Sequence, residues 1–134
     1  MTDMELVSAA LTAMKSSYAP YSHFNVGAAL LCADGSVYLG CNVENASYGA
    51  CNCAERTSVF KAVSEGKRKL SAIAVVGGPH GCVRELCPPC GICRQVLSEF
   101  AGADFRVILY DGEKTESHTL SSLLPLGFSS ENVK

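Results

Sequence analysis

Three cysteines at intervals of three positions, within Cys87-Pro88-Pro89-Cys90-Gly91-Ile92-Cys93, restrict how the chain can fold around this segment. Two thiolates at this spacing converge when they open a helix, because the free backbone N–H groups of its first turn stabilise negative sulfur. Two such pairs overlap here. The prolines remove two N–H donors and hold Cys87 in an extended approach to the helix. The sequence therefore favours Cys90 and Cys93 as the converging pair.

A third thiol, that of Cys53, opens another expected helix two residues before the carboxylate of Glu55. Zinc binds thiolates tetrahedrally, and a site with three protein ligands keeps its fourth position for water, whereas a structural site normally closes with four protein ligands. Cys51 and Cys87 are the nearest candidates for a fourth ligand. A structural site of four thiolates is therefore the alternative to a catalytic one.

The motif around these thiols favours the catalytic interpretation. Zinc deaminases carry a His or Cys ligand, one further residue, a Glu that is not a ligand, and later Pro-Cys-x-x-Cys. Residues 53–55 and 89–93 supply every element of that pattern. We therefore predict one Zn²⁺ on Cys53, Cys90 and Cys93, with Glu55 as the catalytic proton carrier.

Eight cysteines in 134 residues would also suit a secreted disulfide scaffold, but the N-terminus lacks the basic start and apolar run of a signal peptide. We therefore expect a cytoplasmic protein whose thiols bind metal or are buried. A net charge of −2 does not fit a polynucleotide-binding domain, and no apolar run approaches the length of a membrane span. The composition predicts no nucleic-acid partner and no membrane partner, while the 48% hydrophobic fraction favours self-association.

The chain length and the absence of a linker predict a single domain over residues 1–134. A capping box at Thr2 and Glu5 begins a helical pattern, and Asp34-Gly35 joins two β-leaning runs as a hairpin turn. Helices are expected over about residues 3–16, 53–65 and 90–100, strands over 24–32, 37–43, 72–76, 106–110 and 115–118, a Gly/Pro-rich loop over 77–89, and a helical turn over 120–124. This order predicts an α/β fold with a mixed sheet covered by helices.

Six segments make the sequence similar to the cytidine deaminase family; they cover residues 18–22, 24–29, 40–45, 52–57, 89–96 and 123–128. The resemblance spans nearly the whole chain. It implies a three-layer α/β/α fold with a central mixed β-sheet and one zinc ion per subunit. It also implies a homotetramer with active sites at subunit contacts, which deaminates free cytidine and deoxycytidine to uridine, deoxyuridine and ammonia in pyrimidine salvage.

In that family's chemistry, zinc makes a water acidic, and the residue matching Glu55 takes its proton and then protonates N3 and the leaving nitrogen of the ring. Three thiolates leave excess negative charge at the zinc. The resemblance gives Arg56 hydrogen bonds to the thiolates that would offset this charge, and Gln95 is a further expected donor to the site.

The resemblance also assigns substrate contacts: Phe24 on the pyrimidine, Asn42 and Glu44 on ribose hydroxyls, main-chain groups of Ala54 on the base, and Tyr48 and Phe128 in a neighbouring subunit's pocket. Strand alternation would place Asn42 and Glu44 on one face. Because Glu44 would repel a nearby 5′-phosphate, we expect free nucleosides to be the substrates.

Two other functions stay open. One is a deaminase of a related aminopyrimidine such as blasticidin S, although the matches at Phe24 and residues 42–45 favour cytidine. The other is a zinc-stabilised structural or interaction module in which Glu55 does no chemistry. Residues 78–88 are longer than the common family form and add Cys82 and Cys87, and no function is assigned to them.

Overall fold

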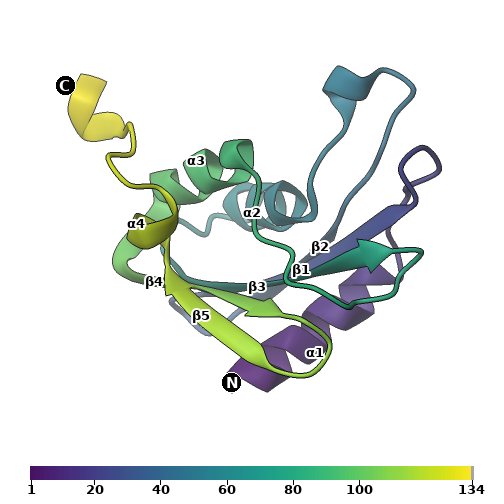
Figure 1. Cartoon of the computed structure of the whole chain (residues 1–134). Coiled ribbons are helices and arrows are strands. Elements are labelled where there is room, and N and C mark those ends of the chain that lie inside the picture. Colours follow the sequence, from purple (N-terminus) through teal and green to yellow (C-terminus); the bar gives the residue numbers. More distant parts are fainter. Residues whose placement is uncertain (134) are drawn as a thin grey trace.

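A five-stranded mixed sheet forms the centre of the computed structural model, which describes residues 1–133 (Figure 1). The strands are β1 (Phe24–Cys32), β2 (Val37–Cys41), β3 (Leu70–Pro79), β4 (Ala101–Tyr110) and β5 (Thr115–Thr119). They lie in the order β2-β1-β3-β4-β5. Neighbouring strands are antiparallel except β3 and β4, which are parallel. The predicted mixed sheet is confirmed.

Helices cover both faces of this sheet (Figure 1). They are α1 (Asp3–Met14), α2 (Ala54–Ser64), α3 (Gly91–Phe100) and α4 (Leu120–Leu123), with short 3-10 turns η1 (Tyr48–Ala50) and η2 (Ser130–Val133). α1 packs on one face, and α2, α3 and α4 lie on the other. The expected three-layer α/β/α arrangement is therefore confirmed. Within residues 1–133, no helix is long and apolar enough to cross a membrane.

Strand β3 explains why both faces need a covering layer. Ala74 and Val76 belong to the buried cluster under α1, whereas Ile73 and Val75 belong to the cluster under α2 and α3. Successive side chains of a strand point to opposite faces, so a strand that is apolar at every position must be covered on both sides. The sheet thus carries two cores, one under each helical layer.

Two glycines allow helices to approach the sheet closely. A Cβ at Gly27 would lie 2.1 Å from the carbonyl oxygen of Ala10 in α1, and one at Gly40 would lie 2.3 Å from the carbonyl oxygen of Ala54. Only glycine permits backbone contact at these distances. Gly40 therefore lets the first turn of α2, which contains Glu55, lie directly on β2.

The element bounds differ from the sequence-based expectations where the chain leaves the sheet. The first helix ends at Met14, two residues earlier than expected. β2 ends at Cys41 rather than at residue 43, because Val43 pairs outside the sheet with Tyr18 and Asn52. Residues 42–44 therefore form a crossing point between segments that are distant in sequence.

The third and fourth strands are longer than expected. β3 continues to Pro79, inside the segment expected as a loop, because Phe24 at the start of β1 pairs with it. The chain then folds back so closely that a Cβ at Gly78 would lie 1.8 Å from the carbonyl oxygen of Cys82. β4 begins at Ala101, immediately after α3, rather than at residue 106.

Candidate active site

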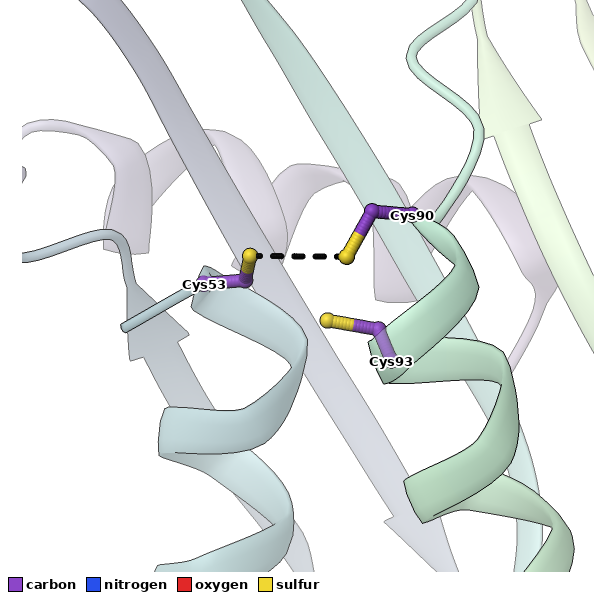
Figure 2. A group of neighbouring side chains, drawn as sticks. All are labelled: Cys53, Cys90 and Cys93. Atoms are coloured by element: carbon purple, nitrogen blue, oxygen red, sulfur yellow. Dashed lines mark hydrogen bonds between the residues drawn. The ribbon is translucent and has the colours of Figure 1, made fainter. Parts of the chain in front are cut away.

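Three thiols converge where two helices begin. Cys53 is the N-cap residue of α2, Cys90 is the N-cap residue of α3, and Cys93 lies in the first turn of α3. Their sulfur atoms all lie within 4.8 Å of one another, and those of Cys53 and Cys90 are 3.7 Å apart. Figure 2 shows the three side chains pointing toward one another from the two helices. The structure therefore brings together the three cysteines that the sequence predicted as ligands.

This geometry fits a zinc ion. Tetrahedral zinc with Zn–S bonds of about 2.3 Å places its sulfur ligands roughly 3.8 Å apart, close to the observed 3.7 Å between Cys53 and Cys90. The thiols lie at the N-termini of two helices, and the partial positive charge there stabilises thiolates. The donor set therefore suits one zinc ion held by three thiolates, with room for a fourth, non-protein ligand.

Arg56 stabilises the thiolate form of Cys53. Hydrogen bonds from Cys93 first, and then from Arg56 and Cys90, lower the pKa of Cys53 to about 5, and Nη2 of Arg56 lies 3.3 Å from its sulfur. The pKa of Cys93 is raised because this thiol shares a hydrogen bond with Cys53 and is buried. Nε of Arg56 is buried without a hydrogen-bond partner among residues 1–133. The guanidinium thus keeps donor capacity beside the sulfur atoms.

Neither alternative thiol joins this group. Among the described residues, the cluster of possible ligands contains Cys53, Cys90 and Cys93 but not Cys51 or Cys87. Burial first, and then the nearby charges of Glu55 and Cys53, raise the pKa of Cys87 to about 12, so this thiol stays protonated. The sulfur of Cys51 accepts a hydrogen bond from the main-chain N–H of Asn45 at 3.3 Å. The arrangement favours the open site over four thiolates.

Glu55 is the buried acid of the site. It lies in the first turn of α2, and only 4% of its surface is exposed. Burial first, and then the negative charge of Cys53, raise the pKa of its carboxyl to about 7. A group with a pKa near neutrality can both accept and release a proton at physiological pH. The position and the pKa of Glu55 suit a proton carrier.

A cavity of about 470 Å³ lies over the thiols. Its walls include most of the residues that were predicted to contact metal or substrate: Asn42, Glu44, Tyr48, Cys53, Ala54, Glu55, Arg56 and Cys90. Val26, Cys87, Pro88 and Ile92 add an apolar part of the wall that was not predicted. Two of the proposed metal ligands, Cys53 and Cys90, therefore share one cavity with the proposed sugar ligands, whereas Cys93 is fully buried and is not part of its wall.

Two predicted substrate residues lie outside the lining of this cavity. Phe24, which is 40% exposed, lines a separate cavity of about 400 Å³ together with Arg84, Glu85 and Leu86. Phe128 lines a cavity of about 320 Å³ beside α4. Within one chain, neither ring therefore completes the cavity over the thiols.

Gln95 also contacts a different partner from the expected one. Its Nε2 donates to the main-chain oxygen of Phe128 at 2.8 Å. This bond fixes the start of the C-terminal segment, which extends away from the sheet beyond α4 (Figure 1). The structure thus gives Gln95 a contact with the C-terminal segment and shows no hydrogen bond from Gln95 to the three thiols among the described residues.

Asn42 connects several segments through its side-chain amide. Its Oδ1 accepts hydrogen bonds from Oγ of Ser17 and from the main-chain N–H of Val26, the latter at 2.9 Å. Its Nδ2 donates to the main-chain oxygen of Phe24 at 2.8 Å. Although Asn42 lies beyond the end of β2, it still faces the cavity together with Glu44.

Glu44 is held by the segment before β1. Oε1 accepts from the main-chain N–H groups of Tyr21 and Ser22 at 3.0 and 3.1 Å, and Oε2 accepts from Oγ of Ser22. These hydrogen bonds, those from Ser22 first, hold the pKa of Glu44 below its usual range. The carboxylate is therefore ionised in the folded protein.

Sequence reasoning did not single out the hydroxyl groups that support Asn42 and Glu44. Ser22 lies inside one of the matching segments, at residues 18–22, which was a signal that could have identified it. Asn25 likewise lies in the matching segment at residues 24–29, whereas Ser17 lies outside these segments, and its contact with Asn42 depends on how α1 leads into β1.

The fold and the site together define a class of protein: a zinc-binding α/β enzyme that carries a buried acid beside its metal ligands. A family model described as "Cytidine and deoxycytidylate deaminase zinc-binding region" matches residues 1–109. The chain is 52% identical to the cytidine deaminase of Halalkalibacterium halodurans over 130 residues, which cover 96% of this chain and 95% of that protein. The chain belongs to the cytidine and deoxycytidylate deaminase family.

Solved structures agree with this assignment. The crystal structure of cytidine deaminase from Burkholderia pseudomallei superposes with a TM-score of 0.87 at 47% identity, covering 96% of this chain and all of that one. A more distant relative is the blasticidin-S deaminase of Bacillus cereus, which is 29% identical over 95% of this chain and 92% of that protein. The family's zinc-binding region and the thiol cluster agree on one zinc ion as the cofactor.

Proposed function

We propose that this chain hydrolyses free cytidine and deoxycytidine to uridine and deoxyuridine, releasing ammonia, as a step of pyrimidine salvage. The observation that carries the proposal is Glu55, a buried carboxyl with a pKa of about 7 that lines the same cavity as Cys53 and Cys90. The names of the most similar relatives support the choice of substrate.

The ionised carboxylate of Glu55 removes a proton from a water molecule at the metal site. When bound, zinc would act as a Lewis acid that makes this water easier to ionise. Glu55 then carries this proton to N3 of the ring as oxygen adds at C4. As the C4=O bond forms, Glu55 takes the remaining proton from that oxygen and delivers it to the exocyclic nitrogen, which leaves as ammonia when the C4–N bond breaks. Arg56 keeps Cys53 in its thiolate form during these steps.

The hydrogen bonds of Asn42 and Glu44 support recognition of a sugar hydroxyl. An amide has two N–H donors and two acceptor positions, and a carboxylate oxygen accepts two hydrogen bonds. The protein bonds of the described residues leave one N–H of Asn42 and one acceptor position on Oε2 of Glu44 unused. A hydroxyl group complements this pair because it accepts from the amide and donates to the carboxylate.

A phosphate group does not complement the same pair. Its oxygens are acceptors, and its negative charge is repelled by the ionised Glu44. The lowered pKa of Glu44 keeps that charge in place at neutral pH. These properties support free nucleosides over nucleotides as substrates.

The complete active site is proposed to form in a homotetramer, in which residues 1–134 act as one deaminase domain per subunit. Tyr48 and Phe128 are 74% and 60% exposed, although large aromatic side chains are usually covered. Their exposure supports a contact with a neighbouring subunit's pocket. Phe24, whose ring is also exposed, is proposed to pack on the pyrimidine.

The eight free cysteines suit a reducing compartment, which supports the cytoplasm as the location.

Blasticidin S is the second candidate substrate, and the similarity to the deaminase of Bacillus cereus is the observation that favours testing it. The cavity over the thiols could present the same acid and metal to another aminopyrimidine. The hydroxyl-specific pair of Asn42 and Glu44 supports cytidine as the first choice.

The test incubates the zinc-loaded protein with cytidine, deoxycytidine, cytosine, CMP and blasticidin S, and follows the loss of ultraviolet absorbance. We expect turnover of the two nucleosides, little turnover of cytosine and CMP, and loss of activity in Glu55→Gln with zinc content unchanged. Exposed Glu99→Gln on α3 is the control and should be fully active. Zinc-loaded wild type that deaminates none of the five compounds would refute the enzymatic proposal and favour a structural zinc module.

A further inference from the structure

A short chain of hydrogen bonds reaches Asn42 from outside the cavity. Nδ2 of Asn25 donates to Oγ of Ser17 at 3.0 Å, and Oγ of Ser17 donates to Oδ1 of Asn42. Ser17 belongs to the connection between α1 and β1, and Asn25 belongs to β1. Asn42 lines the cavity over the thiols, whereas Ser17 and Asn25 do not.

We propose that Ser17, supported by Asn25, is a positioning residue that fixes Asn42 for binding of the sugar. This inference rests on the proposed function, because it assigns Ser17 a role in the binding of a nucleoside. It concerns a residue that does not touch the substrate and acts only through Asn42.

The protein backbone determines which way the Asn42 amide faces. The main-chain N–H of Val26 can only donate, so its partner is the oxygen Oδ1. The main-chain oxygen of Phe24 can only accept, so its partner is the nitrogen Nδ2. Ser17 therefore meets the oxygen and must act as the donor, while its own oxygen accepts from Asn25.

Ser17 adds two effects to this orientation. It occupies the second acceptor position of Oδ1, so that the amide is held at three points by Ser17, Val26 and Phe24. It also polarises the amide, because a hydrogen bond accepted at the oxygen strengthens the N–H groups as donors. Asn42 therefore offers the cavity one fixed and strengthened N–H donor.

The contribution of Ser17 to the fold itself is separable from this role. Its main-chain N–H bonds to the oxygen of Met14 at 3.1 Å, and alanine preserves that bond. Substitution by alanine removes only the hydroxyl, and substitution by threonine keeps it. These two variants therefore distinguish positioning of Asn42 from support of the backbone.

The experiment measures kcat and KM of zinc-loaded Ser17→Ala with cytidine and with 2′,3′-dideoxycytidine, which lacks the 2′ and 3′ hydroxyls of the sugar. Loss of one hydrogen bond corresponds to roughly a threefold to tenfold change. We expect KM for cytidine to rise by about that factor with kcat nearly unchanged, and kcat/KM for the dideoxy compound to change less than about twofold. Ser17→Thr should restore the KM of the wild type.

Asn25→Ala provides a second route to the same network. Because Asn25 acts through Ser17, we expect a smaller rise in KM for cytidine and no additional effect in the Ser17→Ala background. Ser16→Ala is the matched control, since Ser16 is an exposed neighbour outside the network. Melting temperature and zinc content are recorded for every variant, which separates a folding defect from a binding defect.

Equal losses for cytidine and the dideoxy compound in Ser17→Ala would overturn the proposal, as would an unchanged KM for cytidine. Absence of cytidine turnover in the wild type itself would instead refute the proposed function, so the two failures are distinguishable.

Discussion

Asn42 donates from Nδ2 to the main-chain oxygen of Phe24 at 2.8 Å, so that the residue assigned to the sugar holds the residue assigned to the pyrimidine. The main-chain N–H of Phe24 donates in turn to Oγ of Ser22 at 3.0 Å, and that hydroxyl donates to Glu44. Both main-chain polar groups of Phe24 are therefore tied to sugar-binding candidates. Asn42, Phe24 and Glu44 are therefore connected by one network of hydrogen bonds at the start of β1.

Asn42→Asp should disturb this network, although the new side chain has nearly the same shape as the old one. The substitution replaces the donor that faces the oxygen of Phe24 by a carboxylate oxygen, so two acceptors oppose each other. We expect stability to fall by about 1–3 kcal/mol and KM for cytidine to rise more than about tenfold. Urea denaturation and steady-state kinetics measure the two effects.

The control for this variant is Asn132→Asp. Asn132 uses its Oδ1 to accept from the main-chain N–H of Ser129 at 2.9 Å, and an aspartate keeps that acceptor. Its stability and kinetics should match the wild type. Equal effects in the two variants would show that added charge, and not the lost donor, is responsible.

Arg56→Gln should weaken the metal site. The guanidinium stabilises the Cys53 thiolate at 3.3 Å, and an uncharged amide cannot offset the negative charge of three sulfur ligands. Loss of such a supporting group typically lowers metal affinity or activity by about 10–100-fold. Competition with a chelator measures the zinc affinity, and Arg68→Gln, at an exposed arginine, is the control. Full zinc affinity together with full turnover in Arg56→Gln would contradict the assigned role.

Ionisation of Glu55 should cost stability in the metal-free protein. Its folded pKa of about 7 lies above the ordinary value of 4.5, so the folded state favours the protonated form. Below pH 4.5 the carboxyl is protonated in both the folded and the unfolded states, and the cost appears as pH rises from there to about 7. Glu55→Gln removes the cost and should be more stable than wild type by up to about 3 kcal/mol at pH 8.

Denaturation of both metal-free proteins between pH 4 and pH 8 measures this difference. The three cysteines are present in both proteins, and the measured difference includes the repulsion between the Cys53 thiolate and the Glu55 carboxylate. A stability difference that does not grow with pH would mean that Glu55 is not held in a low-dielectric site.

Gly40→Ala should displace the start of α2. The added Cβ would lie 2.3 Å from the carbonyl oxygen of Ala54 and 2.6 Å from the main-chain nitrogen of Ser58, neither of which can move without moving the helix. We expect a loss of about 1–3 kcal/mol and a reduced zinc affinity, because Cys53 caps this helix. Gly102→Ala, with open space around its Cβ, is the control. Unchanged zinc affinity in Gly40→Ala would show that α2 adjusts independently of its cap.

The metal site could be predicted from sequence because its determinants are short-range. Cys90 and Cys93 share one helical turn, and Cys53 precedes Glu55 by two residues at the start of another helix. Spacing and helix-start chemistry therefore indicated the three thiols, and the family resemblance indicated that the two helices lie side by side. The outline of the sheet followed from similar local signals, such as the hairpin at Asp34-Gly35.

The surroundings of the sugar site could not be predicted in the same way, because they depend on contacts between distant segments. β2 stops at Cys41 because Val43 pairs with Asn52 and Tyr18, and no local sequence pattern predicts this pairing. Ser17 reaches Asn42 across 25 positions for the same reason. The extension of β3 to Pro79 was hidden by the glycines at 77 and 78, whose composition is typical of loops.

Cys53 and Cys90 are 37 positions apart and belong to different helices. An ion bound to both therefore favours the folded state, in which the two thiols already lie together. In the unfolded chain, closing a loop of this length costs about 4 kcal/mol of conformational entropy in the chain-entropy model, so the ion binds the unfolded chain more weakly. Metal supply would then set the lifetime of the folded protein in addition to its catalytic capacity, and chelation would expose the chain to unfolding and proteolysis.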